Sequence, residues 1–198
     1  MPLTTVILNH FINQTMKKRC EWAKDEPNIT YHDNEWGKPQ HDDQKLFEFL
    51  ILEGAQAGLS WTTILNRRDG YRKAFSNFDA KKVSKYTPKH VKKLLQDESI
   101  IRNRLKINSA INNARQFLKV QKEFGSFDEY LWGFVNHKPI KNKFKKLDDL
   151  PASTEISEKL SQDLKKRGFN FVGPTICYAL MQAIGMVNDH TSNCYLFK

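Results

Sequence analysis

The sequence has no apolar run approaching the roughly 20 residues that a helix needs to cross a bilayer, so no membrane-spanning segment is expected. A short apolar patch occurs within residues 4–20, TTVILNHFINQTMKKRC. Its charges follow the patch and no small-residue cleavage site is present, which is not the pattern of a signal peptide. We therefore expect a cytoplasmic protein that has no membrane partner.

Cysteine is also scarce, with three in 198 residues: Cys20, Cys177 and Cys194. Disulfide scaffolds in small secreted domains use a dense and usually even set of cysteines. An odd and sparse set leaves free thiols or metal ligands as the two interpretations.

The alternation of apolar and polar residues that is typical of half-buried strands is almost absent, and there are no internal repeats or low-complexity tracts. Apolar residues recur instead at helical spacing, for example at Ile107, Ala110, Ile111 and Ala114. This spacing predicts helices over residues 42–59, 62–77, 88–97, 103–123, 126–135, 155–166 and 173–186. The predicted fold class is all-α, with an irregular, lysine-rich crossing over residues 136–153.

The charges that are present are mostly positive. Lysine and arginine number 32 against 22 aspartates and glutamates, which gives a net charge of +10 and a pI near 9.5. Such a charge suits a polyanionic partner, because contacts to phosphate groups supply much of the affinity for nucleic acid. A basic, solvated surface has the same composition, so charge alone leaves both interpretations open.

Two pairs of cysteine and histidine lie near opposite ends of the chain. Cys20 and His32 are separated by eleven residues, and His190 and Cys194 by three. Two thiolates and two imidazoles form the ligand set of a closed tetrahedral zinc site, which would be structural because no coordination position stays open. The alternative is that His32 only caps a helix or packs beside Trp36 and that the cysteines are ordinary.

Two glycines bound a short segment between the helices predicted over residues 155–166 and 173–186. Gly168 follows Lys165 and Lys166, and Gly173 begins the second helix. A glycine-bounded hairpin can present backbone N–H groups and a positive helix N-terminus to a DNA phosphate. The alternative is an ordinary helix end, in which Gly168 caps the helix and the lysines favour its C-terminus.

Glu53 is a carboxylate on an apolar stripe. It shares a helical face with Leu46, Phe49 and Leu50, whereas Glu48 falls on the more polar side of the same predicted helix. Burial of a carboxylate raises its pKa and is costly unless the group is paired. Glu53 is therefore one half of a buried ion pair, a helix-cap partner or an acceptor that faces a ligand.

Several aromatic side chains with polar edges occur near these residues. They can stack on a nucleobase, and they attract a cationic base more strongly; packing in the core is the alternative for each. They are Trp22, Tyr31, Trp36 and Trp61.

Taken together, these segments resemble the 3-methyladenine DNA glycosylase I family, a branch of the helix–hairpin–helix DNA glycosylase superfamily. The resemblance covers residues 19–195 and depends on an ordered set of motifs. They are RCEWA, YHDNEWG, LFEFLILEGAQAGLSW, FDAKKV, IIRNRLKI, FVNHKP, LKKRGFNFVGPTICYALMQAIGMVNDH and TSNC. Residues 19–198 would then form a single glycosylase domain with two helical lobes and a helix–hairpin–helix element. To residues 1–18, an N-terminal extension, we assign no function.

The resemblance implies a monofunctional DNA glycosylase of base excision repair, active on double-stranded DNA and expected to be a monomer. Such an enzyme flips 3-methyladenine out of the duplex and hydrolyses its N-glycosidic bond, which leaves an abasic site. Glu53 would be the catalytic residue and would bind the base edge; whether it also activates water stays open. Tyr31 and Trp61 would stack on the base, and Trp36 would shape the surroundings.

The resemblance also assigns the remaining sites. One structural zinc ion per chain would join the two ends of the domain, and the glycine-bounded hairpin would bind DNA. Leu59 is a candidate to fill the gap left by the flipped base, although an ordinary core leucine would explain it equally well. The zinc ligands would be Cys20, His32, His190 and Cys194, and the DNA-binding residues Gly168, Gly173, Lys165, Lys166 and Leu59.

Two rival functions remain at this point. One is a zinc-containing protein that binds damaged DNA without excising the base. The other is a glycosylase with a shifted specificity, which is suggested by Asn28, since relatives often have a second pocket tyrosine at this position.

Overall fold

The computed structural model describes residues 17–197, so most of the expected N-terminal extension, residues 1–16, lies outside the described part. Helices dominate, and the only regular strands within residues 17–197 are two short ones. The all-α prediction is therefore confirmed in substance. The elements are α2 (Asn28–Asn34), α3 (Asp43–Gln56), α4 (Trp61–Leu65), α5 (Arg68–Ala74), η1 (Ser76–Phe78), α6 (Ala80–Val83), α7 (Pro88–Leu94), α8 (Arg104–Phe124), α9 (Phe127–Gly133), β1 (Ile140–Lys141), η2 (Leu147–Asp149), α10 (Glu155–Lys166), α11 (Pro174–Ala183) and β2 (Val187–Asn188).

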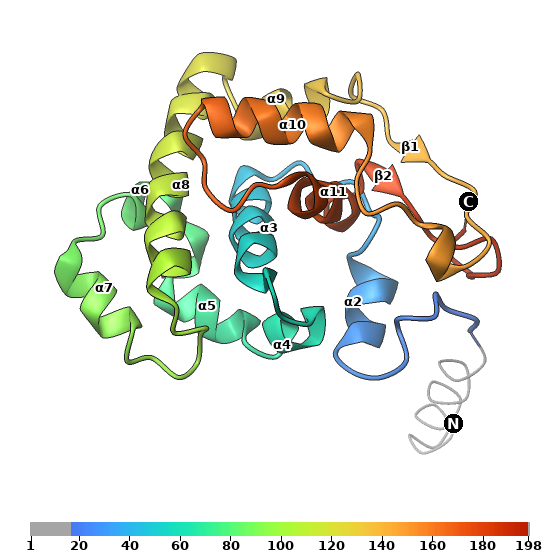
Figure 1. Cartoon of the computed structure of the whole chain (residues 1–198), viewed down its shortest axis with the longest axis horizontal. Helices are drawn as coiled ribbons and strands as arrows, with labels where there is room; N and C mark the ends of the chain where they lie inside the picture. The colour runs from blue at the N-terminus through green and yellow to red at the C-terminus, as the bar shows by residue number, and fades with distance from the viewer. Residues whose placement is uncertain (1–16, 198) are drawn as a thin grey trace, which may run out of the picture.

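Helix α3 is the central element. It lies between α5 to α8 on one side and α11 on the other (Figure 1), and it packs against α8, α9 and α11. The Asp42 side chain begins the helix by accepting a hydrogen bond from the Lys45 N–H at 2.9 Å. Every residue from Leu46 to Ala55 is buried, which is typical of a helix enclosed on all sides. The prediction that Glu48 lies on a polar face is therefore wrong, since Glu48 is only 3% exposed.

The prediction of a single helix over residues 62–77 is also wrong. The chain forms α4, α5 and η1 there instead. The residues of η1 have positive φ values, which a continuous α-helix of L-residues does not contain. Arg68, at the beginning of α5, turns inward and pairs with Glu48 on α3. A tertiary contact thus overrides a regular apolar spacing.

The other predicted helices exist with small shifts. The helix over 155–166 has the observed bounds, and the one over 173–186 ends earlier, at Ala183. The helix over 88–97 likewise ends earlier, at Leu94. Two short helices, α2 and α6, were missed by the apolar pattern. Their start signals are nevertheless in the sequence, because Pro27 precedes α2 and the Asp79 side chain caps α6.

The crossing over residues 136–153 is irregular, as predicted, except for η2 and the short strand β1. Strand β1 pairs in parallel with β2, with Ile140 opposite Val187 and Lys141 opposite Asn188. This pairing fixes the crossing beside the C-terminal segment. Consequently Leu147 and Leu150 lie near α11 and contribute to the pocket described below.

The N- and C-terminal parts of the described chain meet. The Tyr195 N–H donates to the Lys18 carbonyl at 2.8 Å, and the Gly37 N–H donates to the Gln182 carbonyl at 2.9 Å. Both described ends therefore lie on the same side of the molecule (Figure 1). No helix within residues 17–197 is long and apolar enough to cross a membrane.

Gly185, just after α11, allows this close approach. Its φ is +72°, and an added Cβ would collide with the backbone of Lys38 and Pro39. We expect Gly185→Ala to lower the free energy of unfolding by about 3 kcal/mol, because strain at positive φ and overpacking add together. Gly125→Ala is the matched control: its φ is +89° but nothing lies within 4 Å, so only the backbone strain is expected. Equal losses in urea denaturation would contradict the role of close packing at Gly185.

Candidate active site and metal centre

A pocket of about 230 Å³ opens between the N-terminal segment, α3, α4 and α11. It is smaller than the roughly 300–1,000 Å³ typical of sites for drug-sized ligands, a size that suits one flat ring system. The structure brings together here Glu53, Tyr31, Trp36 and Trp61, the four residues predicted to bind substrate. The lining consists of Trp22, Tyr31, Trp36, Glu53, Gln56, Trp61, Leu147, Leu150, Ala179 and Gln182.

Glu53 is the acidic group of this pocket. Its side chain comes from the last turns of α3, and the residue is 4% exposed. Among the described residues, no side chain forms an ion pair or hydrogen bond with its carboxylate. Burial raises the pKa of Glu53 to about 8. A buried acceptor without a partner is costly to maintain, so the group is available to a ligand.

Glu48, one and a half turns earlier on α3, shows what a paired buried carboxylate looks like in this protein. It accepts from Arg68 at 2.6 Å, from Arg72 at 2.8 Å and from Lys45 at 3.0 Å. Burial opposes ionisation, but these cations outweigh it and lower the pKa of Glu48. The buried ion pair considered for Glu53 therefore belongs to Glu48. Of the interpretations that the sequence left open, Glu53 fits the acceptor that faces a ligand.

Aromatic rings form much of the pocket wall. The ring centroids of Tyr31 and Trp61 lie 5.2 Å apart, and those of Trp22 and Trp36 lie 5.1 Å apart. The Trp61 indole N–H is buried and has no hydrogen-bond partner in the described part of the chain. Burial, followed by the nearby charge of Glu53, raises the pKa of Tyr31 well above 10, so this phenol stays neutral. The pocket thus offers ring faces and one acceptor, Glu53, that no described side chain occupies.

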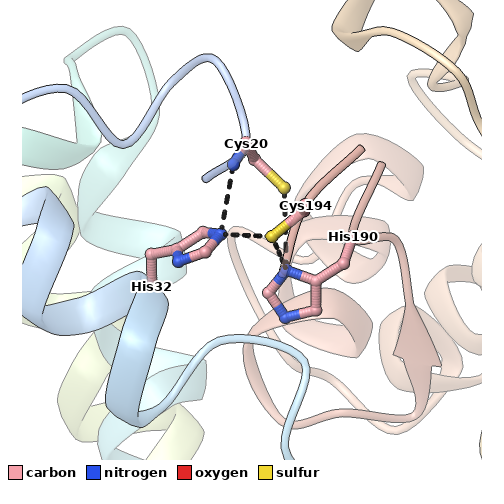
Figure 2. Close-up of side chains that lie close together, drawn as sticks. All are labelled: Cys20, His32, His190 and Cys194. Carbon is pink, nitrogen blue, oxygen red and sulfur yellow. Dashed lines mark hydrogen bonds between the residues drawn. The ribbon is translucent and has the colours of Figure 1, made fainter. Parts of the chain in front are cut away.

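The four predicted metal ligands converge beside this pocket (Figure 2). All are buried, and their ligand atoms lie within 4.8 Å of one another. The Cys194 Sγ is 3.4 Å from His32 Nε2 and 3.6 Å from His190 Nδ1, and the Cys20 Sγ is 3.6 Å from the same Nδ1. Metal–sulfur bonds of about 2.3 Å and metal–nitrogen bonds of about 2.0 Å at tetrahedral angles give S···N edges of about 3.5 Å. The group therefore fits a four-coordinate metal ion.

The outer nitrogens of both imidazoles have partners that orient the rings. His32 Nδ1 lies 2.9 Å from Asp33 Oδ1, and His190 Nε2 lies 3.3 Å from the Trp36 carbonyl oxygen. Carboxylates and backbone carbonyls are the usual acceptors for metal-bound histidines. Burial alone would raise the pKa of Asp33, but hydrogen bonds from Arg19 and His32 lower it to about 2. Asp33 is therefore a charged acceptor that holds the His32 ring.

The two thiols have opposite tendencies. The Cys20 thiol donates to Cys194, and this hydrogen bond, together with the contacts of Cys194 with the ring nitrogens of His190 and His32, lowers the pKa of Cys194. The same hydrogen bond, together with burial, raises the pKa of Cys20. One thiolate is thus favoured before any cation binds, which is the state that a metal ligand requires.

The predicted hairpin lies between α10 and α11. Gly168 has φ of +86° and follows the end of α10, and Gly173 caps the beginning of α11. The segment between them is bound to α8 through Asn113. The side-chain amide of Asn113 donates to the Asn170 carbonyl at 2.9 Å and accepts from the Asn170 backbone N–H at 2.8 Å. Lys165 and Lys166 are exposed in the last turn of α10. The geometry is that of two packed helices joined by a short loop.

Leu59 lies outside the pocket lining, on the turn between α3 and α4. It is 39% exposed, one of the few exposed large apolar residues among those described. The interpretation of Leu59 as an ordinary core residue is therefore wrong. Gly58, with φ of +75°, directs the chain out of α3 and leaves Leu59 at the tip of the turn.

Asn28 does not line the pocket. It is buried, and its amide donates to Thr62 at 2.8 Å and to Asp25 at 3.2 Å. Asn28 therefore braces α2 against α4 behind Trp61. Gln56 and Gln182 were missed as lining residues, since glutamine carries no distinctive sequence signal. Trp22 was among the aromatic candidates but was not assigned to the pocket.

The sequence and the structure of the chain are both similar to those of methyladenine glycosylases. A family model described as methyladenine glycosylase matches residues 22–197. The chain is 48% identical over 180 residues to the DNA-3-methyladenine glycosylase of Haemophilus influenzae. The aligned region covers 90% of this chain and 97% of that protein. A crystal structure of a 3-methyladenine DNA glycosylase I has a TM-score of 0.89 at 47% identity, covering 91% of this chain and all of that chain. A tyrosine-to-phenylalanine variant of such an enzyme, in complex with 3-methyladenine, has a TM-score of 0.88 at 33% identity, covering 91% and 97%.

Proposed function

Because the chain belongs to the methyladenine glycosylase family, we propose that it flips 3-methyladenine out of alkylated duplex DNA and hydrolyses the N-glycosidic bond of that base. The products are the free base and an abasic site, as in the first step of base excision repair. Residues 19–198 act as a single glycosylase domain in this proposal.

One observation carries the proposal: Glu53 is a buried acceptor in an aromatic pocket, and no side chain within residues 17–197 pairs with it. 3-Methyladenine has an exocyclic amine that donates hydrogen bonds, and it is cationic while it is attached to the sugar. With a pKa of about 8, Glu53 is mostly protonated at neutral pH when no ligand is bound, and a cationic base beside it favours the ionised form. The ionised Glu53 then accepts from the amine and attracts the cation, and the faces of Tyr31 and Trp61 favour the same charge.

The chemistry needs little acid catalysis. Methylation at N3 makes the base a good leaving group: when the N-glycosidic bond breaks, its electron pair moves to the base, which departs neutral. Water then attacks the anomeric carbon and loses a proton, which leaves the hydroxyl of the abasic sugar. The chain's role is to hold the extruded base, to exclude other purines and to keep a negative charge near the developing sugar cation.

Two surface elements would hold the DNA. The loop between Gly168 and Gly173 would act as the helix–hairpin–helix element and bind the backbone, with Lys165 and Lys166 beside it. Leu59, exposed at the tip of its turn, would fill the gap that the flipped base leaves in the stack. The net charge of +10 favours such binding.

The metal group would hold one zinc ion. Two thiolates and two imidazoles are a preferred zinc ligand set, and a closed site supplies structure rather than chemistry. Cys20 and His32 come from the N-terminal part, and His190 and Cys194 from the C-terminal part, so the ion would join both. Trp36 connects this centre to the pocket, because its carbonyl accepts from His190 and its ring lines the cavity.

A base-release assay tests the function. Purified protein is incubated with methylated duplex DNA, and the released bases are separated by chromatography. We expect 3-methyladenine as the main product and a matching number of abasic sites. Binding to methylated duplex without release would favour the rival damage-binding protein, and release of a different alkylated base would favour a shifted specificity.

The proposed DNA contact of the hairpin makes a separate prediction. Lys165→Ala/Lys166→Ala should weaken DNA binding and reduce the slope of log K against log salt concentration by up to about 2, because each lost phosphate contact contributes about 0.9. The matched control is Lys92→Ala/Lys93→Ala, which removes the same two charges from the last turn of α7. Fluorescence anisotropy at several salt concentrations measures both. Equal effects of the two pairs would contradict a specific contact at the hairpin.

A further inference from the structure

Lys106, near the beginning of α8, contacts the far end of α3. Its Nζ donates to the carbonyl oxygen of Ala55 at 2.8 Å and to that of Ala57 at 2.7 Å. These two carbonyls belong to the last turn of α3 and to its C-terminal cap. The contact joins segments that are about 50 residues apart in sequence, as these paired positions show.

The contact provides hydrogen-bond donors to carbonyl oxygens at the C-terminal end of α3. The last carbonyls of an α-helix have no partner in their own helix and carry the negative end of its dipole. The Gln56 carbonyl at this helix end has a partner, because it accepts from the Leu59 N–H at 2.6 Å. Among the described residues, no hydrogen bond to the Ala55 or Ala57 carbonyl other than those from Lys106 is found beyond the helix's own ladder. A lysine ammonium satisfies both carbonyls and complements the dipole.

The turn that Lys106 holds is the one that carries Leu59. It consists of residues 57–60, contains Gly58 at positive φ and passes directly into α4, which begins at Trp61. Glycine at this position gives the backbone more freedom than other residues would. Lys106 ties the Ala57 carbonyl at the beginning of this turn to α8.

Helix α8 also contacts the loop between Gly168 and Gly173. Asn112 donates to the Gly168 carbonyl at 2.7 Å, and Asn113 exchanges two hydrogen bonds with Asn170. The same helix, six and seven residues earlier, provides Lys106, whose backbone N–H is capped by Asn103. One rigid helix therefore sets the position of the Leu59 turn relative to the loop between Gly168 and Gly173.

We infer that Lys106 is a positioning residue for base flipping: it anchors the turn of residues 57–60 so that Leu59 is held ready to enter the DNA stack. This inference rests on the proposed function and deepens it. Lys106 acts through Leu59 and does not contact the base. Its effect should therefore be largest where opening the duplex is hardest.

The test compares Lys106→Met, which removes the donors but keeps the chain length, with Lys119→Met, an exposed lysine on the same helix. We expect Lys106→Met to slow release from a fully paired methylated duplex by about tenfold, a typical loss for charged hydrogen bonds. The loss should be smaller when the damaged base is mismatched, because such a base flips more easily. Lys119→Met should change neither rate.

A double-mutant cycle with Leu59→Ala tests whether Lys106 acts through Leu59. If it does, Lys106→Met should add little to the loss already caused by Leu59→Ala. Additive losses, or equal losses on paired and mismatched duplexes, would overturn the inference. A fall of about 1 in the salt slope would also overturn it, since that would show a direct phosphate contact.

Hydrogen exchange supplies a readout that does not depend on activity. The amide of Leu59, which donates to the Gln56 carbonyl, should exchange faster in Lys106→Met than in the wild type. Lys106→Arg, which keeps the donors, should restore slow exchange. Unchanged exchange would overturn the inference even if the enzyme is active. Failure of the wild type to release any base would instead overturn the proposed function. Lys106→Arg also covers the case in which Lys106→Met does not fold.

Discussion

Glu53→Gln is expected to reduce the release of 3-methyladenine from methylated DNA by about 10- to 100-fold, the range for losing one hydrogen bond to a charged group. Glutamine keeps the size of the side chain, but it removes the negative charge that favours a cationic base. The carboxylate has no partner among the described residues, so no protein contact is broken by the change. Single-turnover kinetics on one duplex substrate measures the loss. An unchanged rate in a folded variant would contradict the assigned role.

The same substitution should stabilise the protein at high pH. The pKa of Glu53 rises from about 4.5 in the unfolded chain to about 8 in the folded protein. Between these two values the unfolded chain loses the proton while the folded protein keeps it, so the stability cost is absent below pH 4.5, grows between pH 4.5 and 8, and is complete above pH 8. Each unit between the two pKa values corresponds to about 1.4 kcal/mol. Urea denaturation should show equal stability of Glu53→Gln and wild type at pH 4.5 and a growing advantage of the variant up to pH 8.

Glu48→Gln is the matched control on the same helix. It leaves Arg68, which is 7% exposed, with a weakened set of partners. Breaking a buried pair typically costs about 3–5 kcal/mol, so this variant should be less stable than the wild type while its folded fraction still releases base. Glu53→Gln is thus predicted to raise stability and to reduce base release, whereas Glu48→Gln is predicted to lower stability and to keep base release. Identical behaviour would show that burial, and not the presence of partners, distinguishes them.

The sequence predicted the helical class because apolar residues at helical spacing fill most of the core, as on α8, where Ile107, Ala110 and Ala114 are all buried. It misplaced Glu48 for a physical reason. Spacing on one helix assumes a wet face and a dry face, whereas α3 is enclosed on all sides, and a buried ion pair with Arg68 makes its second carboxylate tolerable. A partner 20 residues away leaves no periodic signal.

The candidate site was predictable to the extent that chemistry is visible in single residues. Glu53 interrupts an apolar run, and paired cysteines and histidines have a ligand spacing, so both could be selected before the fold was known. Their convergence could not be derived from spacing, because the cluster joins residues about 170 positions apart. Lys106 could not be selected at all: it is one of many lysines, and its role depends on two backbone carbonyls of another helix.

Removing the metal ligands is expected to have the largest effect on stability. Cys194→Ser should lower the metal content from about one zinc ion per chain to near zero and lower the Tm by more than about 10 °C. The free energy of binding structural zinc is about 10–16 kcal/mol in small domains, and each kcal/mol changes Tm by about 2–4 °C in a chain of this length. Atomic emission measures the metal, and calorimetry with and without a chelator measures the Tm.

Cys177→Ser distinguishes loss of the metal from loss of a buried thiol. Cys177 is as buried as Cys194, but it lies in α11 outside the cluster and contacts the Val172 carbonyl, which a serine can also reach. Its metal content should therefore be unchanged and its Tm should shift by a few degrees at most. Because the proposed zinc site would have no open coordination position, release of base by Cys194→Ser below its Tm should fall only in proportion to the folded fraction. Complete loss of release from a folded, metal-free variant would show that the ion takes part in the chemistry, and full stability without metal would show that the four residues pack without one.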